Sequence, residues 1–347
     1  MNRPPETLAS AEPAVPISGV RRYSYHAYGI PIRSDLPFPL KETSAPLEPT
    51  VDLFRGGPAY FQEIMRGRFV PPDPENWRES LTLPDGSDYV RWPDLFEFLI
   101  SPDGRRIAYN PLSKPSILAF ETYLLSMVLS YALLKLEYEV LHATAVVVDG
   151  AALALLGPSG HGKSTLAAAF LSAGYPVLTD DLLVLAESQD GILIPPGIPR
   201  IKLFPETAAR FLPFPVAGEP MNPLTNKLVI PLPELHTWRA PALLRAVYRL
   251  PDPWAARPRR TVRIARMPSK TAFLKLLAGT FNTSVLDPKR LKRHFETTSK
   301  ILTRVPIRSV SFQRELDYVP VVRDAIVTDF RRIRVKLRPA KPGIGKT

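Results

Sequence analysis

The stretch GPSGHGKST, residues 157–165, constrains the fold more than any other part of this chain. It satisfies the pattern G-x-x-x-x-G-K-[ST], in which glycines let successive backbone N–H groups turn toward a phosphate. The pattern requires a strand before it and a helix after it, and the flanking segments AALALLG and STLAAAFLSAG have those characters. A phosphate-binding loop on an α/β scaffold is therefore predicted.

The polar groups of this loop point to a nucleotide. Lys163 would supply a cation between the β- and γ-phosphates, and the hydroxyl of Ser164 is placed to ligate Mg²⁺. The helix that begins there adds the positive end of its dipole. ATP and Mg²⁺ are the expected cofactors. The predicted nucleotide-binding residues are Gly157, Pro158, Ser159, Gly160, His161, Gly162, Lys163, Ser164 and Thr165.

Two adjacent carboxylates, Asp180 and Asp181, end the next apolar segment, YPVLT. Strand, glycine loop, helix and strand form a βαβ unit, which predicts neighbouring parallel strands with both carboxylates beside the phosphates. Adjacent ionised carboxylates repel each other unless they share a cation or a proton, which suits a Mg²⁺ site with a spare base. The alternative is that both residues only cap a loop.

Composition and length suggest how the chain is organised. A length of 347 residues favours two domains. Short aromatic and β-branched segments, with Pro-Asp-Gly turns at 84–86 and 102–104, predict a β-rich start. The predicted organisation is a flexible leader over residues 1–20, a β-rich domain over 21–115, a P-loop domain over 116–330 and a basic tail over 331–347.

The apolar segment 116–141 is long enough to span a membrane as a helix. Glu121 near its start and the serines at 126 and 130 favour a buried core helix instead, so no membrane span is expected. The first twenty residues lack the apolar run of a signal peptide, and the absence of cysteine excludes disulfides and thiolate chemistry. A cytoplasmic location is the expectation.

Charge is concentrated at the end of the chain. The net charge is +12, and residues 331–347 hold seven basic residues and no acid. This distribution favours a solvated tail over a nucleic-acid-binding surface, although contact with an anionic partner stays open.

The segment from Leu141 to Leu185, LHATAVVVDGAALALLGPSGHGKSTLAAAFLSAGYPVLTDDLLVL, resembles the catalytic core of the HPr kinase/phosphorylase group. It is more similar to the HPr-kinase-like relatives of that enzyme than to the classical enzyme. The segments YSYHAYGIPIRSDLPFP, LAGTF and VPIRSV resemble such proteins in peptide-modification clusters. In that group the opening histidine lies by the catalytic acid, the glycine loop binds the nucleotide, and the first aspartate of the pair is the catalytic base. The resemblance implies these roles for His142, the loop and Asp180, with Asp181 aiding Mg²⁺ or the loop. Taken alone, His142 would be a core or edge residue.

The expected fold class is α/β, with an HPr-kinase-like P-loop domain on a mixed, largely parallel or barrel-like sheet behind a smaller β-rich N-terminal domain. The expected function is transfer of the γ-phosphoryl group of ATP to a hydroxyl, a serine of a peptide or protein. Asp180 would take the proton while Lys163 and Mg²⁺ offset charge. The proline-rich segment 191–234 is typical of substrate loops. Its cations Arg200, Lys202 and Lys227 are candidate substrate contacts, with surface solvation as the alternative.

Other functions remain compatible with these residues. One is a nucleotide-dependent binding module that hydrolyses ATP as a switch, and another is a small-molecule hydroxyl kinase. The identity of the acceptor, phosphorylase activity, the preference for ATP or GTP and the formation of a homo-oligomer also stay open.

Overall fold

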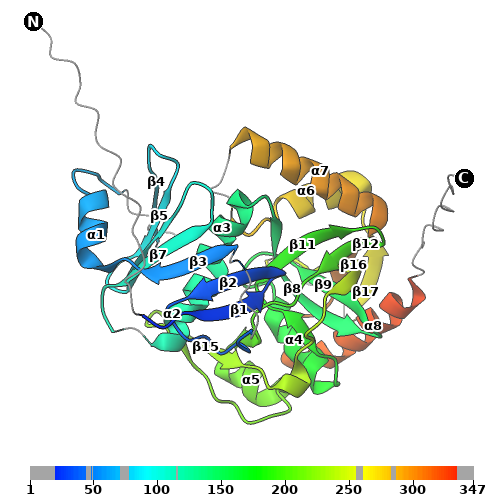
Figure 1. Ribbon diagram of the computed structural model, residues 1–347. Coiled ribbons are helices and arrows are strands. Elements are labelled where there is room, and N and C mark those ends of the chain that lie inside the picture. The colour runs from blue at the N-terminus through cyan, green and yellow to red at the C-terminus, as the bar shows by residue number, and fades with distance from the viewer. Residues whose placement is uncertain are drawn as a thin grey trace, which may run out of the picture. The chain divides into compact units, whose positions relative to one another are not determined.

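The computed structural model describes residues 20–43, 48, 50–70, 78–114, 116–254, 261–282 and 287–333 (Figure 1). The chain forms two compact units, residues 1–25 with 31–115, and residues 26–30 with 116–347. The predicted mixed α/β class is confirmed. Apart from Val20, the predicted leader lies outside the described residues, as do residues 334–347 of the predicted tail. Arg331 and Arg332, the first two residues of that tail, belong instead to the last helix.

The first unit is built on one sheet. Its elements are β1 (Tyr23–Ala27), β2 (Ile30–Ser34), β3 (Val51–Arg55), α1 (Gly57–Ile64), β4 (Glu79–Thr82), β5 (Asp88–Trp92), β6 (Phe96–Ile100) and β7 (Arg106–Pro111). The strand order is β1-β2-β3-β7-β6-β5-β4, with parallel pairs β2–β3 and β3–β7 and antiparallel pairs from β7 to β4. The two Pro-Asp-Gly turns join β4 to β5 and β6 to β7. Gly86 and Gly104 have positive φ there, so these predicted hairpins are confirmed.

The second unit carries the glycine loop. Its first elements are α2 (Ile117–Tyr123), the π-helix η1 (Leu124–Val128), α3 (Leu129–Lys135), β8 (Glu139–Val148), β9 (Ala151–Leu156), α4 (Lys163–Ser172), β10 (Val177–Thr179), β11 (Leu182–Ser188), β12 (Gly191–Ile194), β13 (Arg200–Leu203) and α5 (Pro205–Phe211). The later elements are β14 (Glu219–Asn222), β15 (Thr225–Pro231), η2 (Glu234–His236), β16 (Ala242–Arg249), β17 (Arg263–Arg266), α6 (Ser269–Leu277), α7 (Pro288–Arg304), β18 (Ile307–Ser311), η3 (Leu316–Tyr318) and α8 (Val319–Arg332).

The main sheet of this unit is mixed, as predicted, but most of its strand pairs are antiparallel. β9 pairs in parallel with β16 and antiparallel with β8, and β8 pairs antiparallel with β10 and β11. The strands before and after α4 are therefore parallel to each other with β8 between them. The prediction of neighbouring parallel strands is wrong, because the β8–β9 hairpin, which turns at Asp149 and Gly150 with positive φ, inserts β8 at that position. A largely parallel sheet is likewise wrong. The barrel-like alternative is supported, because the pairs β8–β11, β11–β12, β12–β16, β16–β9 and β9–β8 close a ring of strands.

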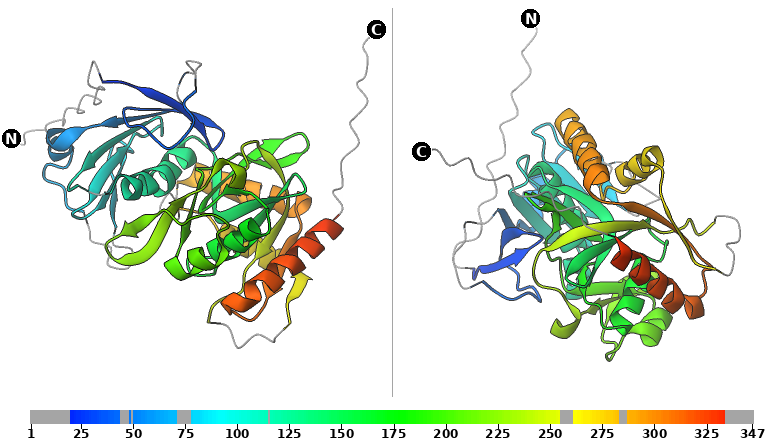
Figure 2. Two further views of the ribbon diagram at one scale, coloured as in Figure 1. Left: turned by 90° about the horizontal axis from the view of Figure 1, so that it is seen from below. Right: turned by 90° about the vertical axis from the view of Figure 1, so that its right-hand side faces the viewer.

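Two apolar layers cover the faces of the main sheet. On β8, Val146 and Val148 pack with α4, α5 and α8, whereas Ala145 and Val147 pack with α6 and α7. Figure 2 shows α7 (orange) and α8 (red) on opposite sides of this sheet. Because side chains alternate along a strand, Thr144 and His142 lie on the same face of β8 as Val146 and Val148, nearer to the start of the strand. Thr144 and Ser164, in the first turn of α4, both contact Asp180. The sheet thus presents polar side chains beside the start of α4.

The apolar helix predicted from 116–141 is built from α2, η1 and α3. In the part of the chain that the structure describes, residues 117–135 are the one helix long and apolar enough to cross a membrane, with a mean hydropathy of 1.7. In the most apolar 18-residue window of this helix, 78% is buried within the protein. The apolar composition is therefore that of a core helix.

Gly197 lets the chain run close beside β10. Its N–H donates to the carbonyl of Leu178 (2.9 Å), and a Cβ added at Gly197 would collide first with Oγ1 of Thr179 and would lie 3.0 Å from Cε1 of Tyr28. We expect Gly197→Ala to lower the free energy of unfolding by about 1–3 kcal/mol, the usual cost of overpacking, as measured by urea denaturation. Adding Thr179→Ala should recover part of the loss. Equal stability of Gly197→Ala and the wild type would contradict this account.

Candidate functional site

The glycine loop occupies the segment between β9 and α4, as the sequence predicts. Gly160 and Gly162 have φ values of +79° and +86°, which glycine adopts without steric cost. Pro158, Ser159 and Gly160 are exposed at its tip. The backbone N–H groups at the start of α4 have no intrahelical partner, so this end of the helix is suited to an anion.

Lys163 lies inside the loop. It is 6% exposed, and its Nζ donates to the carbonyls of Gly157 (2.6 Å) and Pro158 (3.1 Å). Burial lowers the pKa of Lys163 to about 8, an effect that the negative charges of Asp181 and Asp180 partly oppose. A buried ammonium group with only carbonyl partners would gain from a phosphate placed beside it.

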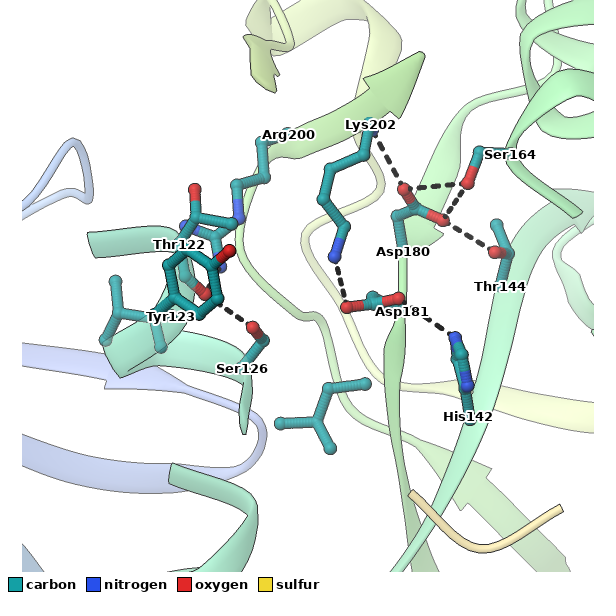
Figure 3. A network of polar contacts seen from close by, with 12 residues as sticks. Thr122, Tyr123, Ser126, His142, Thr144, Ser164, Asp180, Asp181, Arg200 and Lys202 are labelled. Atoms are coloured by element: carbon teal, nitrogen blue, oxygen red, sulfur yellow. Dashed lines mark hydrogen bonds and ion pairs between the residues drawn. The ribbon is translucent and has the colours of Figure 1, made fainter. Parts of the chain in front are cut away.

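Asp180 is held by donors from three elements (Figure 3). Its Oδ1 accepts hydrogen bonds from Oγ1 of Thr144 (2.6 Å) and Oγ of Ser164 (3.0 Å), and its Oδ2 accepts one from the backbone N–H of Lys202 (3.1 Å). These donors lie on β8, in the first turn of α4 and on β13. Asp180 is 8% exposed. It therefore lies beside the glycine loop, although its strand is not the neighbour of β9.

A tight turn has Asp181 at its centre. The N–H of Leu182 donates to the carbonyl of Asp180 (3.1 Å), and Asp181 has a φ of +78°, as in the rare γ-turn with positive φ. Neighbours in a regular strand point to opposite faces. Here Asp180 contacts Thr144 and Asp181 contacts His142, which lie two residues apart on one face of β8. The turn thus brings both carboxylates to the same face, and such backbone geometry is typical of functional sites.

Asp181 is paired with two basic side chains. Its Oδ1 lies 3.1 Å from Nε2 of His142, and its Oδ2 forms an ion pair with Nζ of Lys202. Burial alone would raise the pKa of Asp181, but the charge of Lys202 and the hydrogen bond with His142 outweigh it and hold that pKa well below its usual value. The sequence pairs Ser164 with Asp181 as metal ligands, whereas the structure joins Ser164 to Asp180.

We expect Asp181→Asn to destabilise the protein. Removing one partner of a mostly buried ion pair leaves Lys202 uncompensated, and the free energy of unfolding at pH 7 should fall by about 2–4 kcal/mol. Because the pKa of Asp181 is lowered by folding, its contribution is present above the pKa of about 4 of an unfolded aspartate and is lost as the pH falls through the folded value. The stability gap between the two proteins should therefore narrow in acid.

Urea denaturation without added metal, from pH 7 to pH 3, measures this gap. The matched control is Asp317→Asn, which removes an 81%-exposed partner of Arg210 and should cost less than about 1 kcal/mol. A gap that stays constant with pH would contradict the role assigned to the Asp181 charge.

The three cations of the proline-rich segment have different surroundings. Lys202 contacts both aspartates, one through its side chain and one through its backbone N–H. Lys227 is half-buried, and burial, followed by the charge of Lys202, lowers its pKa. Arg200 is 7% exposed, and its Nη2 donates to the carbonyl of Thr122 (3.1 Å), which ties β13 to α2. The structure thus brings Lys202 to the aspartates, and the observed contact of Arg200 is structural.

Three residues near the loop were not predicted from the sequence. Thr144 contacts Asp180, Nη1 of Arg249 lies 3.1 Å from Nδ1 of His161, and Nη2 of Arg314 donates to the carbonyl of Gly160 (2.8 Å). Thr144 could have been found, because it lies two residues after His142 on a strand and so shares its face. The two arginines follow or end strands distant in sequence, and no local pattern marks them.

Comparisons with known proteins add little to this geometry. No protein-family model matches the chain, and no curated protein matches it. Among solved structures, the HPr(Ser) kinase/phosphatase from Coxiella burnetii is similar over 56% of this chain and 96% of that chain, with 13% sequence identity and a TM-score of 0.32.

Proposed function

We propose that this protein is a P-loop kinase that transfers the γ-phosphoryl group of ATP to a hydroxyl group. The observation that carries the proposal is the position of Asp180. Its carboxylate accepts a hydrogen bond from Ser164 of the glycine loop (3.0 Å) and is held by two further donors, one on β8 and one on β13. A carboxylate held beside a phosphate-binding loop is the arrangement that a general base for phosphoryl transfer requires.

The loop residues would bind the triphosphate. Backbone N–H groups of residues 160–165 would surround the β-phosphate, and Lys163 would turn from its carbonyl partners to the β- and γ-phosphates. The charged form of a buried lysine is stabilised by that contact, which opposes the lowering of its pKa to about 8 by burial. Positioning and charge compensation are most of what an enzyme contributes to this reaction.

The oxygen groups beside the loop fit Mg²⁺. Ser164 presents a hydroxyl oxygen 3.0 Å from a carboxylate oxygen of Asp180, and Mg²⁺ prefers such oxygen ligands together with water and phosphate oxygens. The part of the chain that the structure describes contains no group of three acidic or histidine side chains arranged for a metal ion, so the remaining ligands would come from water and the nucleotide. Ser164 and one carboxylate of the 180–181 pair would hold the ion, whose charge would offset that of the phosphates.

The proton has a defined destination. The acceptor oxygen forms a bond to the γ-phosphorus, the bond from that phosphorus to the β–γ bridging oxygen breaks, and ADP leaves. The hydroxyl proton of the acceptor passes to Asp180. A carboxylate offers about four acceptor directions. When Ser164 turns to the nucleotide, the direction it occupies on Asp180 becomes free for the acceptor hydroxyl.

The acceptor we propose is a serine of a peptide or protein, in a cytoplasmic setting where ATP is abundant. The resemblance of residues 141–185 to HPr-kinase-like sequences supports this choice over a small alcohol. Lys202, which forms an ion pair with Asp181, and Lys227, whose pKa the charges of both aspartates raise against the effect of burial, would contact the acceptor or the transferring phosphate. His142, which is paired with Asp181, would hold that carboxylate in place.

The test is transfer of label from γ-labelled ATP by the full-length protein in the presence of Mg²⁺. The acceptors are a panel of serine-containing peptides, proteins and small alcohols. Label on a hydroxyl acceptor, with ADP formed in equal amount, supports the kinase. Label recovered only as free phosphate across the panel would contradict it and favour a nucleotide-dependent binding module.

A further inference from the structure

A cleft of about 140 Å³ opens beside the start of α4 in the second unit. One wall is formed by the first turn of this helix, with Gly162, Thr165 and Leu166. The opposite wall is the segment from Phe312 to Val322, which follows β18 and includes η3 and the start of α8. The cleft does not include Asp180 or Asp181 and is distinct from the carboxylate site.

The walls of the cleft combine apolar and polar side chains. Leu166 and Phe312 are buried, Leu316 is half-buried, and Arg314 and Glu315 lie at the exposed rim. Apolar walls with a few polar groups are typical of sites for flat organic ligands. The volume is below the roughly 300 Å³ and more that drug-sized ligands occupy, so one ring system fits better than a whole cofactor.

Topology explains why the cleft lies beside the glycine loop. β9 and β18 both pair in parallel with β16, so all three strands end at the same edge of the sheet. The glycine loop follows β9, and the segment from Phe312 follows β18. Arg314 joins the two segments through its hydrogen bond to the carbonyl of Gly160 (2.8 Å). Ligands of α/β proteins bind at this edge, where segments that follow different strands converge.

We propose that this cleft holds the purine base of the nucleotide whose phosphates the glycine loop binds. This inference rests on the proposed function and adds the site of base recognition. Gly162 and Thr165, which flank Lys163 and Ser164, line the cleft, so a nucleoside attached to phosphates at the loop would reach it within the first turn of α4. The planar guanidinium of Arg314 can stack on a base, and Glu315 can accept hydrogen bonds from ring amino groups.

The experiment compares ATP with inorganic tripolyphosphate, which has the phosphates without the base. Calorimetric titration in the presence of Mg²⁺ should give the wild type at least about tenfold higher affinity for ATP. Leu316→Trp, which fills the cleft, should remove most of that difference and leave tripolyphosphate binding within about twofold. The matched control is Leu235→Trp, because Leu235 also lies on a short 3-10 helix and is 86% exposed.

The outcomes separate the two proposals. Equal affinity of the wild type for ATP and tripolyphosphate overturns the base site, whatever the variant does. The same holds if Leu316→Trp keeps the full preference for ATP. If the wild type binds neither ligand, the phosphate-binding loop itself is refuted and the proposed function fails with it. Retained tripolyphosphate binding by Leu316→Trp also shows that the variant has folded.

Discussion

Asp180→Asn is expected to lower the rate of phosphoryl transfer by about 100-fold or more, the usual contribution of a general base. Asparagine keeps the size of aspartate and one acceptor oxygen for the hydrogen bond from Thr144, but it cannot take the proton of the acceptor hydroxyl. Affinity for Mg·ATP should stay within about threefold of the wild type, because in the proposed complex Lys163 and the loop N–H groups would make most of the phosphate contacts. Initial rates with γ-labelled ATP and calorimetric binding measure the two effects separately.

Asp149→Asn is the matched control for this variant. Asp149 lies in the β8–β9 turn of the same sheet, has positive φ as asparagine tolerates, and is partly exposed beside Arg331. Its rate of transfer should equal that of the wild type. If Asp180→Asn transfers phosphate at the wild-type rate, the base lies elsewhere. If the wild type only hydrolyses ATP and Asp180→Asn leaves that hydrolysis unchanged, the protein is a nucleotide-dependent binding module and not a kinase.

Lys163→Ala should raise the Kd for Mg·ATP by about 30-fold or more and abolish detectable transfer. The loss corresponds to one charge-assisted contact in a shielded site, about 2–3 kcal/mol. Lys163 is 6% exposed, so a cation from the solvent cannot readily take the place of its ammonium group. Calorimetric titration with Mg·ATP measures the change.

Lys300→Ala is the control for the removal of a positive charge. Lys300 is 46% exposed and pairs with Glu187 on the surface, so its variant should bind Mg·ATP as the wild type does. The thermal midpoint of Lys163→Ala should be within a few degrees of the wild type, because only the hydrogen bonds to Gly157 and Pro158 are lost. Unchanged affinity in a folded Lys163→Ala protein would mean that the loop does not hold the phosphates.

Features of the fold that depend on local sequence could be predicted. The Asp149-Gly150 dipeptide between two apolar runs indicated the β8–β9 hairpin, and Gly174 marked the end of α4 through its positive φ. The loop at 157–162 could be placed between a strand and a helix for the same reason, since residues other than glycine rarely adopt the positive φ of Gly160 and Gly162. In each case the determining residues are neighbours in the chain.

The arrangement of the strands could not be predicted in this way. A βαβ pattern fixes the direction of the strand after α4 but not the strand beside it, and here the long strand β8 pairs with both β9 and β10. The register of those pairs depends on packing between segments far apart in sequence. Asp180 lies beside the glycine loop as predicted, but the prediction was based on neighbouring parallel strands. In the structure β8 lies between those two strands.

Side chains contributed by distant segments show the same limit. Thr144 and the backbone N–H of Lys202 both hold Asp180, yet they lie on opposite sides of it in the chain and on different sheets. The residues next to Asp180 in the sequence therefore predict neither hydrogen bond. What a single sequence supplies is the identity of the reactive groups, and the fold supplies the donors that orient them.

The chain crosses between the two units more than once, and this limits how the protein can be divided. Residues 26–30, at the β1–β2 turn, belong to the second unit, where Tyr28 is 1% exposed and donates its hydroxyl to the carbonyl of Leu125 (3.1 Å) and its N–H to that of Pro196 (2.8 Å). A fragment that begins at Ser116 would lack this buried tyrosine and expose apolar surface where its ring lies. The unit that carries the glycine loop is therefore not a module that can be excised at residue 115, and any gene fusion that joined it to another partner would have to carry residues 26–30 along.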